Sequence, residues 1–391
     1  MIKQKNYKKT LIACYLGFVT QAISANYAPL LFLTFKGTYG ISLENIALIP
    51  FVFYFTQLLV DFTATKFADK IGYRTCVVAS QLLSSLGLIL MAILPEIVPV
   101  PFIGILISVV LYAIGSGLIE VLVSPIVEAC PTEKKEAAMS LLHSFYCWGH
   151  VGVVLVSTAF FHVFGIANWK VLALFWAVIP FANSIYFAIV PIYPIVAEHE
   201  KMSLKGMVGQ KVFWIFMILM LGAGAAEQSM SQWASTFAES ALHVSKEVGD
   251  LAGPCAFAIL MGTTRALYGK YSEVLPLKKM MSASAILCIF CYLLAGLSEN
   301  PVFGLLGCAF CGLSVGIFWP GTFSLAASQL PTAGTALYAL MALAGDAGCS
   351  MGPTLVGMVA NANGNNLQAG LLAAIIFPLL ILIYNFVGER Q

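Results

Sequence analysis

Twelve apolar stretches, each long enough to cross a lipid bilayer, follow one another along the 391-residue chain. A helix needs about 20 predominantly apolar residues to span the hydrocarbon core of a membrane. Their approximate limits are 10–34, 46–65, 75–96, 101–127, 137–163, 169–193, 211–236, 248–272, 279–298, 301–327, 332–359 and 367–388. The connections between them are short, so we expect an all-α membrane protein without a separate soluble domain.

The low charge content excludes several classes of protein. Hydrophobic residues make up 60% of the chain and charged residues only 10%, whereas a soluble domain carries about 25% charged residues. A soluble enzyme, a nucleic-acid binder and a disordered scaffold are therefore excluded. The basic N-terminal segment leads into an apolar run of about 24 residues, longer than the 7–15 of a signal peptide, and we expect that run to be retained as a membrane helix.

The ten cysteines lie almost entirely within apolar stretches. Cys288 with Cys291, and Cys308 with Cys311, have the CxxC spacing of some zinc and redox sites. No basic residue adjoins either pair, and basic neighbours are what activate a thiol. We interpret these cysteines as small packing residues, and we expect neither a metal site nor a cofactor.

The basic residues predict the orientation in the membrane. Placing the N-terminus inside the cell puts 16 of the 20 Lys and Arg residues on the cytoplasmic side and three outside. This asymmetry fits the positive-inside rule. We therefore expect a multi-pass protein of the cell (inner) membrane with both termini in the cytoplasm.

Charged and polar positions recur at nearly constant offsets in the two halves. Asp61 and the charged loop after it recur 204 residues later, beginning at Arg265; the polar set 21–27 recurs at 227–233, and 149–152 recurs at 345–348. A duplicated six-helix unit is typical of secondary transporters, whose substrate site lies between the repeats. We predict an N-terminal bundle of residues 1–195, a cytoplasmic linker of 196–210 and a C-terminal bundle of 211–391.

Residues 65–74 read T-K-F-A-D-K-I-G-Y-R. This segment resembles the loop motif G-x3-D-[RK]-x-G-R-[RK] of the major facilitator superfamily, with Thr65 and Tyr73 as departures. The resemblance implies twelve transmembrane helices arranged as two pseudo-symmetric six-helix bundles. In such a fold, Asp69 and Arg74 would lock the cytoplasmic ends of neighbouring helices.

A narrower resemblance is to the fucose–galactose–proton symporter family. Glu120 followed five residues later by Pro125, the run 145–149 (FYCWG) and the run 226–233 (AEQSMSQW) are similar to motifs of that family. In this alignment of motifs, Tyr146 stands where the family has Asn, and His143 stands where the family often has Gln. The resemblance implies proton-coupled uptake of a monosaccharide.

One expected carboxylate of that family is absent. Asn26 stands where the fucose branch has an Asp. This departure leaves the fold expectation unchanged and leaves open the substrate, the proton stoichiometry and whether transport is coupled at all.

Ionisable residues within membrane helices are expensive, at about 2.5–3.5 kcal/mol on insertion scales, and each is a candidate site. Glu120 lies in the run 114–123 and Glu227 in the polar stripe of the seventh stretch. Burial disfavours the charged carboxylate, so such a group can take up a proton on one side and release it on the other. We predict proton coupling through Glu120, assisted by Glu227; structural pairing with a buried His or Arg is the alternative.

Polar and aromatic residues near these acids suit a polyhydroxylated solute. Carboxamides offer paired donors and acceptors to vicinal hydroxyls, and an indole ring can stack on a sugar. Interhelical hydrogen bonding is an alternative role for the amides and hydroxyls. The candidate substrate-binding residues are Gln21, Asn26, Tyr27, Gln57, His143, Tyr146, Gln228, Gln232, Trp233 and Trp319.

A third set suits gating or structural pairing. These residues lie at matching helix ends, in the repeated loops or, in one case, within a glycine-rich apolar run. The set is Asp61, Asp69, Arg74, Arg265, Glu273 and Asp346. His150 is a further intramembrane candidate, for which packing is the favoured interpretation.

No GxxxxGK[ST] sequence occurs, so an ion gradient or a substrate gradient is expected to drive transport. The favoured function is secondary active uptake of a monosaccharide or similar small polar solute, by a monomer embedded in the lipid bilayer. The first alternative is a proton-coupled exporter of drugs or metabolites. The second, from another class, is a membrane sensor or assembly protein that moves no solute. Nothing in the sequence suggests an enzyme or a nucleic-acid partner.

Overall fold

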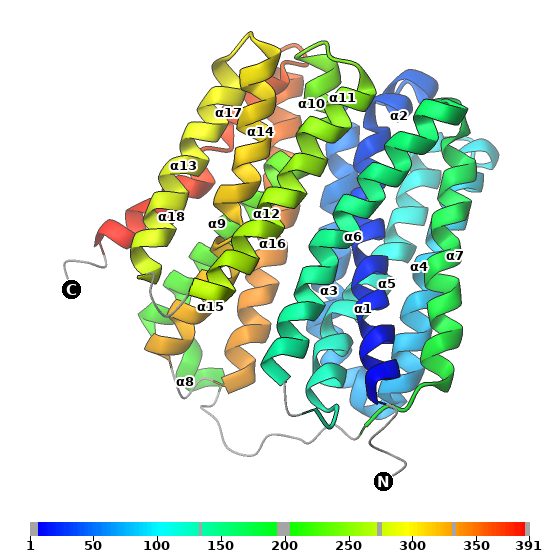
Figure 1. Cartoon of the computed structure of the whole chain (residues 1–391). Helices are drawn as coiled ribbons and strands as arrows, with labels where there is room; N and C mark the ends of the chain where they lie inside the picture. Colours follow the sequence, from blue (N-terminus) through cyan, green and yellow to red (C-terminus); the bar gives the residue numbers. More distant parts are fainter. Residues whose placement is uncertain (1–6, 133–134, 194–203, 272–275, 331–333, 388–391) are drawn as a thin grey trace. The chain divides into compact units, whose positions relative to one another are not determined.

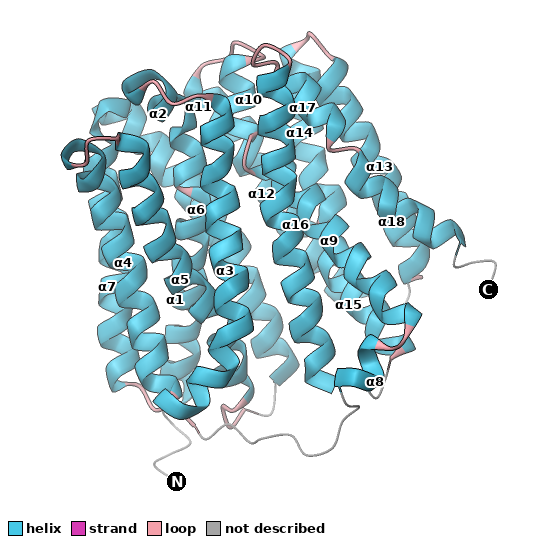
Figure 2. Cartoon of the chain, turned by 180° about the vertical axis from the view of Figure 1, so that it is seen from behind, coloured by secondary structure: helices cyan, strands magenta, loops and turns pink. Residues whose placement is uncertain are grey.

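The computed structural model describes residues 7–132, 135–193, 204–271, 276–330 and 334–387. Within these ranges the chain consists of helices joined by short loops, without a strand (Figures 1 and 2). The long apolar stretches favour this outcome, because a helix satisfies every backbone hydrogen bond within its own segment.

In the first half, the elements lie at the six positions expected from the sequence. They are α1 (Tyr7–Asn26), η2 (Ala28–Leu31), α2 (Phe32–Tyr39), α3 (Leu43–Ile71), α4 (Tyr73–Ile97), α5 (Pro101–Glu128), α6 (Lys135–Phe164), η3 (Ile166–Asn168) and α7 (Trp169–Ile189). Gly72, with a φ of 95°, separates α3 from α4, and glycine tolerates that backbone conformation.

The second half repeats the pattern with more interrupted helices. Its elements are α8 (Leu204–Val208), α9 (Lys211–Ser231), α10 (Ala234–Ser240), α11 (Lys246–Asp250), the π-helix η4 (Leu251–Cys255), α12 (Ala256–Tyr271), α13 (Leu277–Leu297), α14 (Pro301–Val315), α15 (Phe318–Gln329), α16 (Gly334–Ala362), α17 (Leu367–Ala373) and α18 (Ile376–Val387). Asn300 caps α14 by accepting a hydrogen bond from Val302 N at 2.9 Å.

Ten helical segments among the described residues are long and apolar enough to cross a membrane. The other two expected spans coincide with α12 and α16. The prediction of an all-α membrane fold is confirmed.

The chain divides into two compact units, one of residues 1–41 and 52–197, the other of 42–51 and 198–391. In the first, a buried apolar cluster joins α1, α4, α5, α6 and α7, and includes Phe18, Val77, Ile119, Leu142 and Phe187. The predicted linker 196–210 falls partly outside the described residues, and the predicted domain limits stay a prediction.

Glycines in α16 bring this helix against α9 in the second unit. A Cβ on Gly348 would collide with the backbone of Leu221, and one on Gly224 would collide with Gly345. Small residues at such crossings let membrane helices pack backbone to backbone. This close approach fixes the segment of α16 that carries Asp346.

Candidate functional site

Glu120 on α5 receives hydrogen bonds from two side-chain amides of the first unit. Gln21 Nε2 on α1 donates to Glu120 Oε2 at 2.6 Å, and Gln57 Nε2 on α3 donates to the same oxygen. The Ser116 hydroxyl, one turn earlier on α5, donates to Gln57 Oε1 at 3.3 Å. Three helices thus converge on one carboxyl group.

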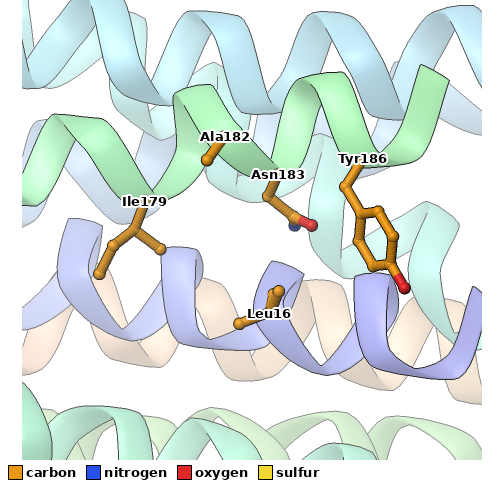
Figure 3. Close-up of a pocket in the computed structure, with 5 residues that line it drawn as sticks. All are labelled: Leu16, Ile179, Ala182, Asn183 and Tyr186. Carbon is orange, nitrogen blue, oxygen red and sulfur yellow. The ribbon is translucent and has the colours of Figure 1, made fainter. Parts of the chain in front are cut away.

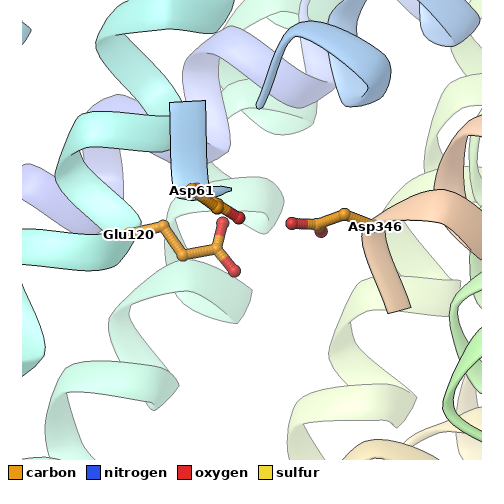
Figure 4. Close-up of side chains that lie close together, drawn as sticks. All are labelled: Asp61, Glu120 and Asp346. Carbon is orange, nitrogen blue, oxygen red and sulfur yellow. The ribbon is translucent and has the colours of Figure 1, made fainter. Parts of the chain in front are cut away.

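Asp61 adds a second carboxyl group beside the first. Figure 4 shows the side chains of Asp61 and Glu120 next to each other, and a carboxylate oxygen of each lies within 4.8 Å of the other. Gly117 permits this approach of α3 and α5, because a Cβ there would lie only 3.2 Å from the Gln57 carbonyl oxygen. The sequence predicted gating or structural pairing for Asp61, and in the structure its carboxyl group lies beside that of Glu120.

The carboxyl groups of Asp61 and Glu120 are close enough to interact electrostatically. At about 5 Å, two negative charges repel strongly where the dielectric constant is low. The amides of Gln21 and Gln57 donate hydrogen bonds to Glu120 and offset part of that repulsion.

In the second unit, Glu227 on α9 is paired with a cation. Arg265 Nη2 on α12 lies 3.3 Å from Glu227 Oε2, and both side chains are largely buried, at 22% and 6% exposed. Gln228 Nε2 donates to Glu227 Oε1 at 3.3 Å, and Gln232 Nε2 donates to Gln228 Oε1 at 3.1 Å. The sequence predicted gating or structural pairing for Arg265, and in the structure Arg265 pairs with Glu227.

Asp346 lies on α16 of the second unit, where it is 3% exposed (Figure 4).

In the second unit the two CxxC segments face each other across α13 and α14, with Cys288 Sγ 4.0 Å from Cys311 Sγ. All ten cysteines are buried free thiols, as the packing interpretation expects.

A family model described as Major Facilitator Superfamily matches residues 13–353. This range covers most of the chain. The chain belongs to the Major Facilitator Superfamily. It is therefore a multi-pass membrane protein and a transporter of that superfamily, as the loop motif at 65–74 indicated.

Solved structures similar to this chain are transporters with little sequence in common. A bacterial homologue of the human lysosomal transporter Spinster, in an inward-facing and occupied conformation, has a TM-score of 0.74 at 14% identity and covers 98% of this chain and 97% of its own. The Escherichia coli fucose:proton symporter FucP has a TM-score of 0.67 at 15% identity. The nucleoside transporter NupG has a TM-score of 0.76 at 13% identity. Each of these two matches covers 98% of this chain and 99% of the other chain. These likenesses show the fold alone. No curated protein matches the sequence.

Three of the predicted substrate residues bond to backbone carbonyl groups in this superfamily member. The Tyr27 hydroxyl donates to Trp169 O at 2.5 Å, Trp233 Nε1 donates to Pro353 O at 2.9 Å, and Asn26 Nδ2 donates to Ala22 O at 2.9 Å. All three side chains are buried. In this conformation their polar groups join helices or turns instead of facing a solute.

The remaining predicted substrate residues are less enclosed. His143 is exposed and packs edge-on against Phe18 at 5.4 Å, while Tyr146 is half-buried beside the apolar core. Trp319, also half-buried, lies 6.2 Å from the ring of Phe323. Their contact with substrate stays a prediction.

Arg74 stabilises the end of a neighbouring helix in the first unit. Its Nη1 donates to the carbonyl oxygens of Phe187 and Ala188 at 2.9 and 2.7 Å, at the C-terminal end of α7. A cation bonded to the last carbonyls also complements the helix dipole. The side chain of Asp69 and the whole of Glu273 lie outside the described residues.

Sequence reasoning missed two features of these sites. Gln57 and Asp61 are four residues apart, as are Ser116 and Glu120, so each pair shares one helix face, a signal readable in the sequence. The second feature is a buried ionic group in the second unit, where Lys246 Nζ lies 3.1 Å from Asp250 Oδ2 and 3.2 Å from Glu239 Oε1. Only folding of α10 against α11 brings that group together.

Proposed function

We propose that this transporter couples the inward movement of protons to uptake of a monosaccharide or a similar small polar solute. Transport occurs by alternating access of the two six-helix halves, in the inner membrane of the cell, with both termini in the cytoplasm and the monomer as the working unit. The observation that carries the proposal is the Glu120 carboxylate, held by two uncharged amides with a second carboxyl group beside it.

The same amides provide a coupling mechanism. While Glu120 is ionised, Gln21 and Gln57 donate to its carboxylate. Protonation removes the negative charge and weakens those hydrogen bonds. The amide groups then become available to solute hydroxyls, so solute and proton bind together.

Glu227 has a different role in this proposal. Its pairing with Arg265 leaves the buried group close to net neutral. Protonating Glu227 would remove one charge of this ion pair, which is costly in a buried site. Proton coupling is therefore assigned to Glu120 with Asp61, and the amides of Gln228 and Gln232 are assigned to solute.

Two of the similar structures support the solute class. FucP is a fucose:proton symporter and NupG is a nucleoside transporter. Both solutes carry several hydroxyl groups, which match the amide-rich sites of the two units.

The first experiment identifies a ligand of the purified protein. Monosaccharides, polyols, nucleosides and cationic dyes are screened for an increase in thermal stability. The ligand is then tested for accumulation in proteoliposomes under an imposed pH gradient. Glu120→Gln should abolish accumulation against the gradient while retaining exchange of labelled for unlabelled solute.

Glu96→Gln is the matched control, because Glu96 is 51% exposed at a helix end and pairs with Lys170. This variant should accumulate solute like the wild type. Uphill accumulation by Glu120→Gln would contradict the proton-coupling role of Glu120. Extrusion of a dye with no uptake of any hydroxylated solute would contradict the uptake proposal.

A further inference from the structure

A groove between α1 and α7 of the first unit plays no part in the proposed transport chemistry. It has a volume of about 380 Å³, within the range of small-molecule sites. Figure 3 shows the five side chains that line it, which are Leu16, Ile179, Ala182, Asn183 and Tyr186.

The groove opens on an apolar face of α7. Val178, Phe181 and Ile185 are 60%, 53% and 54% exposed, and Ala182 lies among them and is exposed as well. In a membrane-spanning helix, such a face contacts acyl chains. A molecule entering the groove would therefore come from the bilayer.

Asn183 supplies a polar group at the base of the groove. Its side chain is buried, with 2% of the residue exposed. Asn183 Nδ2 donates to Ala13 O at 3.1 Å, which fixes the orientation of the amide because the opposite orientation would set two oxygens against each other. Asn183 Oδ1 has no hydrogen-bond donor within the described part of the chain.

An acceptor left without a donor in a hydrocarbon environment is unfavourable. A ligand that brings a hydroxyl group to Asn183 Oδ1 would remove this penalty. Tyr186 adds a phenol on the same groove (Figure 3). The residue set thus combines apolar walls with one acceptor and one phenolic hydroxyl.

The lining also restricts the charge of the ligand. None of the five lining residues is charged, so nothing in the lining compensates a phosphate or an ammonium group. Asn183 lies six residues before Ile189, the last residue of α7, which is about 9 Å along the helix axis. The ligand's polar end therefore lies inside the acyl-chain region and is uncharged.

We propose that this groove binds a neutral, hydroxyl-bearing membrane lipid, with its acyl chain along α1 and α7 and its hydroxyl donated to Asn183 Oδ1. A diacylglycerol has this chemistry. The lipid is distinct from the transported solute, and the site lies on the bilayer-facing side of the unit.

The test uses the full-length protein in phosphatidylcholine nanodiscs. One sample contains a diacylglycerol with a photoactivatable group on one acyl chain, and the other contains the same lipid with its hydroxyl capped as a methyl ether. Labelling of α1 and α7 peptides is measured by mass spectrometry. In the wild type, the lipid with the free hydroxyl should label these peptides about fivefold more than the methyl ether. This ratio corresponds to one hydrogen bond of about 1 kcal/mol, a value typical between membrane helices.

Two variants locate the site on the protein. Ala182→Trp fills the groove from an exposed position, and Asn183→Leu removes the acceptor while keeping the side-chain size. Both should lower labelling by the free-hydroxyl lipid to the level of the methyl ether. Val178→Trp, one turn away on the same exposed face, is the matched control and should label like the wild type.

Equal labelling by the two lipids in the wild type would overturn the proposal and would indicate ordinary annular lipid, with water satisfying Asn183. Unchanged labelling in Ala182→Trp would overturn it too. The comparison between the two lipids needs no substitution, so a variant that fails to fold leaves the test intact.

Discussion

The two units place a carboxyl group in different electrostatic settings. In the first, Glu120 accepts hydrogen bonds from two amides and has the Asp61 carboxyl group nearby. In the second, Glu227 pairs with Arg265. The sequence repeat relates Asp61 to Arg265, so a single position carries opposite charge in the two halves.

This difference separates two roles that the repeat would otherwise assign to both halves. Under the proposed function, the carboxyl group of Glu120 gains and loses the coupled proton. A buried ion pair resists protonation, because removing one charge leaves the other uncompensated. Duplication thus supplies the helices, and exchange of a few charged residues makes the halves unequal.

The largest expected loss of stability follows from removing the Arg265 cation of the second unit. Arg265→Met removes the cation that pairs with the buried Glu227 and should lower the free energy of unfolding by about 3 kcal/mol. The measurement is denaturant or thermal unfolding of the purified protein in one detergent. The double variant Arg265→Met with Glu227→Gln should regain most of the loss, and failure to regain it would contradict the ion pair as its cause.

A direct comparison of the two acids comes next. Glu227→Gln keeps the shape but removes the charge that pairs with Arg265, and should cost about 2 kcal/mol of stability. Glu120→Gln places a neutral amide beside those of Gln21 and Gln57 and should cost less than about 1 kcal/mol. Equal losses in the same unfolding assay would mean that the two carboxyl groups are held alike.

The fold was largely predictable from the sequence, because the length of an apolar run determines whether it can span a bilayer. Helices lie at all twelve expected positions, and ten helical segments among the described residues are long and apolar enough to cross a membrane. The glycines of the run containing Asp346 also indicated close helix packing, which α9 and α16 confirm.

The sites were predictable only in part. Glu120 stands out as an acid in an apolar run, and the sequence also identified Gln21 and Gln57. The pairing of Glu227 with Arg265 joins residues 38 positions apart on separate helices, so no local pattern indicates it. Trp233 looks like a stacking surface in sequence, but tertiary packing buries it completely.

A smaller effect is expected where the repeated loops differ. Arg74 bonds two terminal carbonyls of α7, whereas its repeat counterpart Lys278 is exposed on α13. Arg74→Ala should cost about 0.5–1 kcal/mol, the usual value for a cation at a helix C-terminus. Lys278→Ala should leave the unfolding midpoint unchanged. A loss of stability equal to that of Arg74→Ala would show that a basic side chain stabilises both loops.

The smallest losses of stability are expected from removing one tyrosine hydroxyl in each unit, and they should be equal. The Tyr27 hydroxyl donates to Trp169 O at 2.5 Å in the first, and the Tyr292 hydroxyl donates to Ala226 O at 2.7 Å in the second. Each Tyr→Phe variant removes one buried interhelical hydrogen bond, worth about 0.6 kcal/mol in a membrane protein. Unfolding of both variants should therefore show equal, small losses. A loss confined to one unit would mean that the halves also differ in uncharged packing, whereas equal losses leave the charged residues as the source of their asymmetry.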